Sequence, residues 1–339
     1  MSYDSSASML RDAFARIDGA RIEGRQDNII ERKIALLKLY NRLQSSADKI
    51  VSILVIGDLS YPLYWIAAKV QLESSRAESD ALLELSIVLH TLRQIVDELD
   101  LGKSLQTEYL PRLGRGSSEQ WRPLGNTLII GEPRLPISTS IIPLSIAVAT
   151  GNTTLLILPY KTSSMTKMLE KIIKAALDTE ACGLIMVSTP QARLEVVEEL
   201  LKFGIHNVVG FDEQLFQHIH KMKTCALNTN LLRQVTTPML AIVTRNACLE
   251  IAAKDLFNTV FSWLKGASYT CPSFVLIDEF VLGRFLDILL SLGEEGSNVG
   301  ARPIQTPNVG QMRALNGVEI FVGNAQFRKV TFLLFGFCG

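Results

Sequence analysis

The sequence has little of several features that would point directly to a function. Its 339 residues include only four histidines and five cysteines, and the cysteines are scattered without a CxxC pair. An odd, scattered set argues against a disulfide framework or a zinc ribbon and indicates a reducing compartment. No stretch approaches the roughly 20 apolar residues that span a bilayer, and the N-terminus has no signal-peptide pattern. We therefore expect a cytoplasmic protein without a membrane span.

Charge of either sign is not in excess either. The 34 Lys and Arg residues balance 34 Asp and Glu residues, so the formal net charge is zero. A general nucleic-acid binder needs a positive excess, and we expect no nucleic-acid partner. The apolar fraction of 47% and the mean hydropathy of +0.22 exclude a disordered chain. Both values are also on the high side for a freely soluble monomer.

The hydrophobic pattern changes along the chain. The first third predicts helices at residues 29–56, 64–72 and 82–99, because apolar residues recur at helical spacing. Short apolar runs then alternate with amphipathic helices. The strands are expected at residues 127–130, 155–158, 183–187 and 206–209, with helices at 141–149, 164–177 and 192–203. This alternation predicts a doubly wound, Rossmann-like parallel sheet of the α/β class, which binds ligands at the carboxyl ends of its strands.

A second α/β region follows this sheet. Strands are expected at residues 239–243 and 274–277, with helices at 248–264 and 279–292. We expect two domains: residues 1–230, with N-terminal helices and a Rossmann-like cofactor-type domain, and residues 231–339, a catalytic-type domain.

Several strings in order give the chain a family resemblance. Residues 143–152 (PLSIAVATGN), 238–243 with 248–253, and 266–276 (GASYTCPSFVL) resemble segments of aldehyde dehydrogenases, and residues 28–58 resemble the opening helices of their class-3, fatty-aldehyde branch. Each string alone is a weak signal, but the strings are colinear and cover nearly the whole chain. The resemblance implies a Rossmann-type cofactor domain, NAD(P) as cofactor and a small carbonyl compound as substrate.

The resemblance also identifies positions where the family's chemistry is replaced. Without gaps, the position of the nucleophilic cysteine is Tyr269, whose phenol is a poor nucleophile at neutral pH. Cys271 lies two residues further on and could act only if the loop were displaced; otherwise it is a small buried apolar residue. The position of the oxyanion donor is Arg134, which could hold an anion or be a surface arginine.

The base and the cofactor contacts are replaced as well. The position of the general base is Leu232, and two family glycines become Gln234 and Val235. The lysine that precedes a proline becomes Leu158, or Ile157 with a gap of one residue. The helix-opening Gly-Ser-Thr becomes residues 211–213 (FDE), whose acidic side chains would repel a pyrophosphate. No cofactor-binding residue is therefore assigned.

The resemblance ends before the family's last motifs. Residues 317–323 resemble the strand ahead of the ribose-binding string, so we expect a catalytic-type domain that is truncated at its C-terminus. Apolar faces would then need a covering partner, either a second copy or an intact relative.

Metal binding is not expected. His218 and His220, with Cys225 nearby, are two residues apart and point to different faces of a helix.

Three functional hypotheses follow. The first is a degenerate relative that does not oxidise aldehydes with NAD(P). The second is a pathway enzyme of another class, in which Tyr269 with Arg134 or Glu132 promotes cyclisation, isomerisation or condensation of a carbonyl compound without a cofactor. The third is an active aldehyde dehydrogenase that uses Cys271.

Overall fold

Two units make up the chain: Met1–Pro62 with Glu73–Val235, and Leu63–Leu72 with Thr236–Gly339. This computed structural model describes residues 7–56, 78–109, 114, 122–133, 135–158, 163–187, 189–211, 213–221, 229–233, 239–262, 271–296 and 334–335. The strand at 230–233 pairs within the first unit.

A parallel five-stranded sheet with the order β3-β2-β1-β4-β5 forms the centre of the first unit. Its strands are β1 (Thr127–Ile130), β2 (Thr154–Leu158), β3 (Cys182–Met186), β4 (Asn207–Gly210) and β5 (Asn230–Arg233). The helices are α1 (Ala7–Ile22), α2 (Ile29–Ser45), α3 (Ala47–Ile56), α5 (Glu78–Glu98), α6 (Leu101–Tyr109), α7 (Ser138–Ala149), α8 (Ser164–Ala176), α9 (Pro190–Leu201) and α10 (Glu213–Lys221). This topology confirms the predicted doubly wound α/β fold.

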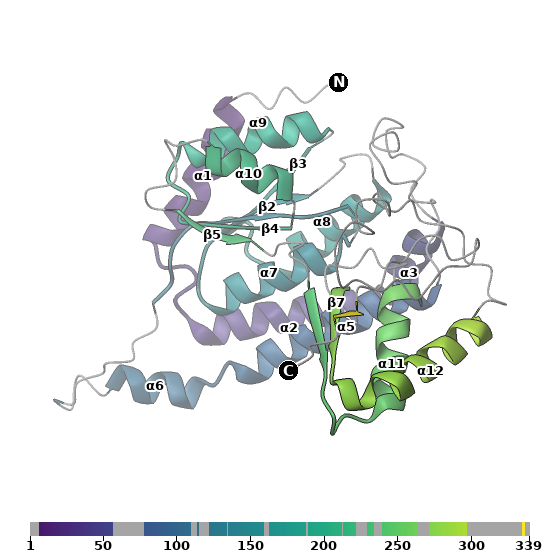
Figure 1. Cartoon of the computed structure of the whole chain (residues 1–339). Coiled ribbons are helices and arrows are strands. Elements are labelled where there is room, and N and C mark those ends of the chain that lie inside the picture. The colour runs from purple at the N-terminus through teal and green to yellow at the C-terminus, as the bar shows by residue number, and fades with distance from the viewer. Residues whose placement is uncertain are drawn as a thin grey trace. The chain divides into compact units, whose positions relative to one another are not determined.

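Helices cover both faces of this sheet (Figure 1). Side chains of successive strand residues point to opposite faces, so each strand contributes to two cores. Leu128 and Ile130 of β1 pack with α1, α9 and α10 on one face. Ile129 of the same strand packs with α2, α3, α5, α7 and α8 on the other face. Strands buried on both faces explain why their sequences are apolar without alternation.

Helix α7 receives a charged side chain from a neighbouring helix at each end. At its start, Glu84 of α5 is 1% exposed, and its Oε1 accepts hydrogen bonds from the backbone N–H groups of Ile137 (3.1 Å) and Ser138 (3.0 Å). At its end, Arg32 of α2 donates from Nη1 to the carbonyl oxygen of Ala149. An acidic group at the N-terminus and a cation at the C-terminus both complement the helix dipole.

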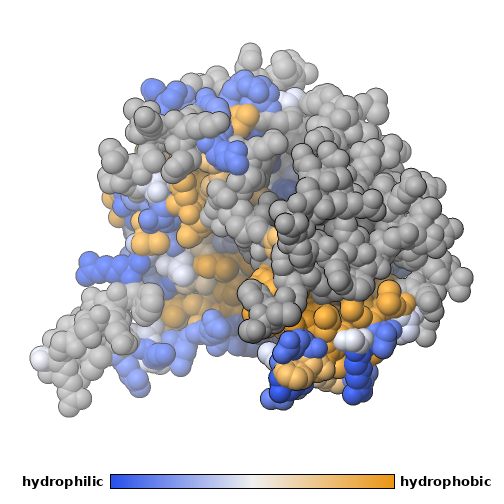
Figure 2. Space-filling view, in the orientation of Figure 1, coloured by the Kyte–Doolittle hydropathy of each residue, from blue (hydrophilic) through white to orange (hydrophobic). Residues whose placement is uncertain are grey.

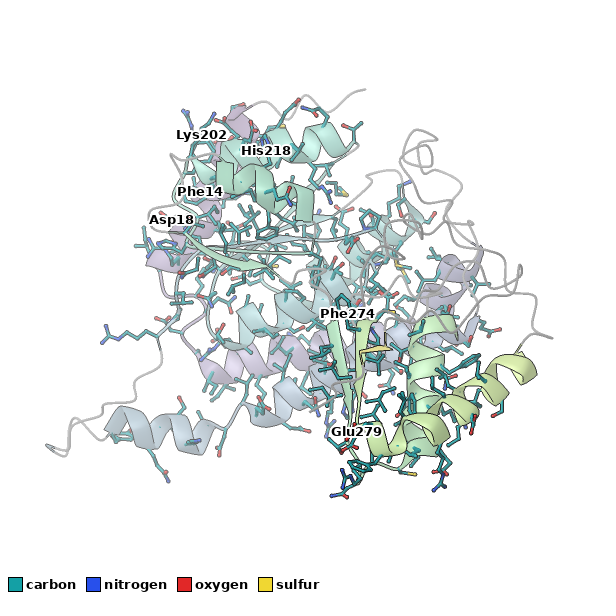
Figure 3. The ribbon with its side chains drawn as sticks, in the orientation of Figure 1. Phe14, Asp18, Lys202, His218, Phe274 and Glu279 are labelled. Atoms are coloured by element: carbon teal, nitrogen blue, oxygen red, sulfur yellow. The ribbon has the colours of Figure 1, made fainter. Side chains whose placement is uncertain are left out.

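A row of polar side chains crosses the amino ends of three strands. Thr127, Asn207 and Asn230 are in register, and amide nitrogens of the two asparagines donate to Thr127 Oγ1 (3.2 Å) and Asn207 Oδ1 (3.1 Å). Next to this row, buried Asn126 donates to Asp18 of α1 (2.8 Å). Figure 3 labels Asp18. Burial acts to raise the pKa of Asp18, but hydrogen bonds from Asn126 and from the Arg21 guanidinium hold this pKa below its ordinary value. These bonds satisfy groups that would be costly to bury unpaired.

The second unit contains a smaller parallel sheet with the order β6-β7-β8. Its elements are β6 (Met239–Val243), α11 (Leu249–Phe257) continuing into a π-helical turn (Asn258–Ser262), β7 (Pro272–Ile277), α12 (Glu279–Gly296) and β8 (Leu334–Phe335). Figure 3 labels Phe274 on β7 and Glu279 at the start of α12. Val243, Val275 and Ile277 pack into one core with α11 and α12. The opposite side of β6 exposes Leu240 (50%) and Ile242 (66%).

Some elements differ from the sequence-based predictions. The single helix expected at residues 29–56 is two helices, α2 and α3, with the break at Ser46. The Ser45 hydroxyl there donates to the carbonyl oxygen of Arg42, a local bond that competes with helix geometry. Helices α1 and α6 and strand β5 were not predicted, and the helix expected at 64–72 lies outside the described residues.

Candidate functional site

The carboxyl ends of β1 and β4 are the position at which a sheet of this topology binds ligands. The chain proceeds from β1 outward to β3, then returns to place β4 on the other side of β1. Ligands of open α/β sheets bind where the strand order reverses in this way. The two strands end in register at Ile130 and Gly210.

Aromatic side chains of the segment after β4 are buried at this position. Phe211, which follows β4 directly, is 7% exposed, and Phe216 of α10 is 2% exposed. A Cβ atom built on Gly210 would lie 2.8 Å from Cε2 of Phe216, so the ring lies directly against the end of β4. Asp212 and the side chain of Glu213 lie outside the described residues.

These residues do not fit a dinucleotide. A phosphate group at a helix N-terminus needs open approach to the backbone N–H groups, which glycine allows and a bulky ring does not. Leu158, which the resemblance puts at the position of the family's lysine, is fully buried at the end of β2, as is Ile157. Neither side chain can donate a hydrogen bond to a phosphate or a ribose.

Leu232, which the resemblance puts at the position of the family's general base, is on strand β5. Leu232 is 54% exposed there, so the site is accessible but carries a hydrocarbon side chain. A leucine can neither accept a proton nor orient a water molecule. Gln234 and Val235 lie outside the described residues.

Of the three predicted catalytic residues, the structure describes only Cys271. It precedes β7 and is half-buried beside the core of the second unit, with Sγ 3.9 Å from the carbonyl oxygen of Pro272. Burial raises the pKa of this thiol, which lowers the fraction of reactive thiolate. Tyr269 and Arg134 lie outside the described residues, so their roles stay predictions.

The other two described cysteines are also free thiols. Cys182 is enclosed in the core, and burial raises its pKa to about 11, as expected of a structural cysteine. Cys248 is exposed at the start of α11, where it donates to Glu250 Oε2 (3.4 Å).

The loop between β1 and α7 is held by groups that the sequence reading missed. Thr139 Oγ1 accepts a hydrogen bond from the backbone N–H of Glu132 (2.9 Å) and donates to the carbonyl oxygen of Leu135 (2.6 Å). Glu84 accepts from the N–H groups of Ile137 and Ser138 at the other end of the loop. The loop is therefore anchored at both ends.

The histidines offer no metal site among the described residues. His218 of α10 contacts Glu198 of α9, and Figure 3 shows it on the α9–α10 side of the sheet. Within the same residues, no group of three or more His, Cys, Asp or Glu side chains could hold an ion. Cys225 and the side chain of His220 are not described. In the described part of the chain, no helix is both long and apolar enough to cross a membrane.

Comparison with known proteins relates both sequence and fold to one family, although no protein-family model matches the chain. The chain is 29% identical over 189 residues to aldehyde dehydrogenase family 3 member F1 of Arabidopsis thaliana, which covers 54% of this chain and 34% of that protein. Lactaldehyde dehydrogenase from Escherichia coli matches in structure with a TM-score of 0.61 and 18% identity, over 85% of this chain and 56% of that one. Salicylaldehyde dehydrogenase from Pseudomonas putida G7 gives a TM-score of 0.61 with 13% identity, over 84% and 56%.

In each case, the matched part is less than two thirds of the relative's own length. The sequence match is to the family-3 branch, and the structural matches share the arrangement of helices and strands. The chain is thus related to the aldehyde dehydrogenase superfamily.

Proposed function

We propose that this chain is an aldehyde-dehydrogenase-like protein that does not carry out NAD(P)-dependent aldehyde oxidation. Leu232 is the observation that carries the proposal. Leu232 lies on β5 with 54% of its surface exposed, and the resemblance puts it at the position of the family's water-activating glutamate. Hydrolysis of a thioester requires a base at this point. The raised pKa of Cys271 and the buried Leu158 support the same conclusion.

The test is formation of NADH or NADPH by the purified full chain with a panel of aliphatic and aromatic aldehydes. Salicylaldehyde dehydrogenase from Pseudomonas putida G7, assayed with salicylaldehyde, is the positive control. We expect no reduced cofactor above the protein-free blank. Aldehyde-dependent formation that disappears in Cys271→Ala would refute the proposal and favour an active enzyme using this thiol.

We also propose that the protein associates with a second copy or with an intact relative in the cytosol. Support comes from the second unit, where β6 exposes Leu240 and Ile242, and Figure 2 shows apolar surface over this unit's described elements. Large exposed apolar patches are typical of association surfaces. Analytical ultracentrifugation should show a species heavier than a monomer, alone or with the relative. Monomers across a wide concentration range, with no complex in the mixture, would contradict association.

A further inference from the structure

Three described residues at the ligand end of the first sheet fit together by size. A Cβ atom on Gly210, the last residue of β4, would lie 2.8 Å from Cε2 and 3.4 Å from Cζ of Phe216. It would also lie 3.5 Å from Cβ of Ile130, the last residue of β1. The Phe216 ring therefore occupies the space that a side chain at position 210 would take, on the face of the sheet that α1, α9 and α10 cover, at the ends of the two strands where the strand order reverses.

We propose that Phe216 is an aromatic plug that fills the space over Gly210 at the ends of β1 and β4, and that it holds α10 in place without any dinucleotide. This inference rests on the proposed function and extends it from catalysis to binding. Helix α10 has nine residues, too few to be stable by itself, so its stability must come from packing. Leu215, Phe216 and Ile219 supply that packing, because each is at most 2% exposed and all three belong to the core with α1 and α9.

The residues at the start of α10 are consistent with the plug. In a phosphate-binding helix, glycine precedes the first turn so that the phosphate can reach free N–H groups. Here Phe211, two residues before the start of α10, is 7% exposed. Gly210 is the small residue of this segment. The Phe216 ring fills the space that a side chain at this position would take.

Thermal unfolding of the full chain, with and without millimolar NAD, NADP or AMP, tests the plug directly. A ligand that binds the native state raises Tm. Because the plug leaves no room for a nucleotide, we expect no shift of Tm with any of the three probes. Isothermal titration should likewise show no saturable heat. A nucleotide-dependent rise in Tm, or a measurable Kd, overturns the plug. If such binding occurs without aldehyde oxidation, the proposed lack of catalysis stands while the plug falls.

Substitutions test the size match independently of any ligand. Gly210→Ala should lower Tm by about 5 °C or more, because the ring would have to move within a packed core. Phe216→Leu should also lower Tm. In the double variant, the smaller leucine accepts the added methyl group, so the combined loss should be smaller than the sum of the single losses. Lys171→Ala, at an exposed position of α8, should leave Tm within about 1 °C. Strictly additive losses would contradict the fit between Gly210 and Phe216.

Discussion

Replacing Glu84 with alanine should lower the free energy of unfolding by about 3 to 5 kcal/mol. Its Oε1 accepts from three donors at the start of α7: the N–H groups of Ile137 and Ser138, and the Ser138 hydroxyl (3.2 Å). The helix has no side-chain cap of its own, since the capping position is occupied by Ile137. Each buried donor left without an acceptor costs about 1 to 3 kcal/mol. Urea denaturation followed by circular dichroism would measure the loss.

Two matched variants separate the cap from other effects of the substitution. Glu84→Gln keeps an amide oxygen that can accept the same bonds, so it should lose much less stability than Glu84→Ala. Glu98→Ala changes an exposed glutamate at the end of the same helix and should stay within about 0.5 kcal/mol of the wild type. Equal losses in Glu84→Ala and Glu98→Ala would show that the three hydrogen bonds do not stabilise α7.

Replacing Gly125 with alanine should cost about 3 kcal/mol of stability. Gly125 has φ of +117°, and a Cβ atom there would lie 2.7 Å from Nδ1 and 2.9 Å from Cγ of His206. The His206 ring cannot move freely, because Nδ1 accepts the N–H of Asn126 (3.1 Å) and the His206 carbonyl accepts the N–H of Asn230 (2.7 Å). Backbone strain of about 1 to 3 kcal/mol therefore adds to the loss of a hydrogen bond.

Gly204 provides a control for the backbone part of this cost. Its φ is +92°, but a Cβ atom there would meet nothing within 4 Å. Gly204→Ala should therefore report strain alone and cost about 1 kcal/mol. A double-mutant cycle of Gly125→Ala with His206→Ala measures the steric part, since alanine at 206 removes the ring. If Gly125→Ala costs no more than Gly204→Ala, contact with the ring is not what requires glycine.

Local pattern predicted the central strands but not the elements at the margins of the fold. Strands β1 and β2 are apolar throughout because both of their faces are buried, and such runs are readable from sequence. Edge strand β5 has only two apolar residues, Leu231 and Leu232, between Asn230 and Arg233, so only its pairing with β4 identifies it. Helix α1 was missed because its buried apolar residues are few, namely Leu10, Ile17 and Ala20.

The candidate site shows the same division between local and tertiary information. The family resemblance identified Leu232 and the segment after β4 from residue types alone. It could not identify Phe216 as the side chain that fills the space over Gly210, because this depends on the ring lying against a glycine six residues earlier in the sequence, within the core that also contains Ile130. The Glu84 cap depends on α5 lying beside α7, which no local spacing encodes. The position of Phe216 and the Glu84 cap are therefore both determined by tertiary contacts.

The charged groups at the ends of α7 also bear on the order in which the chain is made. Arg32 and Glu84 both precede α7 in the sequence, so the ribosome releases them before the helix that they complete. When α7 emerges, the groups that satisfy both of its ends are already available, and neither depends on β4, β5 or the second unit. A nascent chain stalled soon after β2 would therefore contain everything required to close the two ends of this helix, whereas a chain lacking residues 29–98 would leave both ends open.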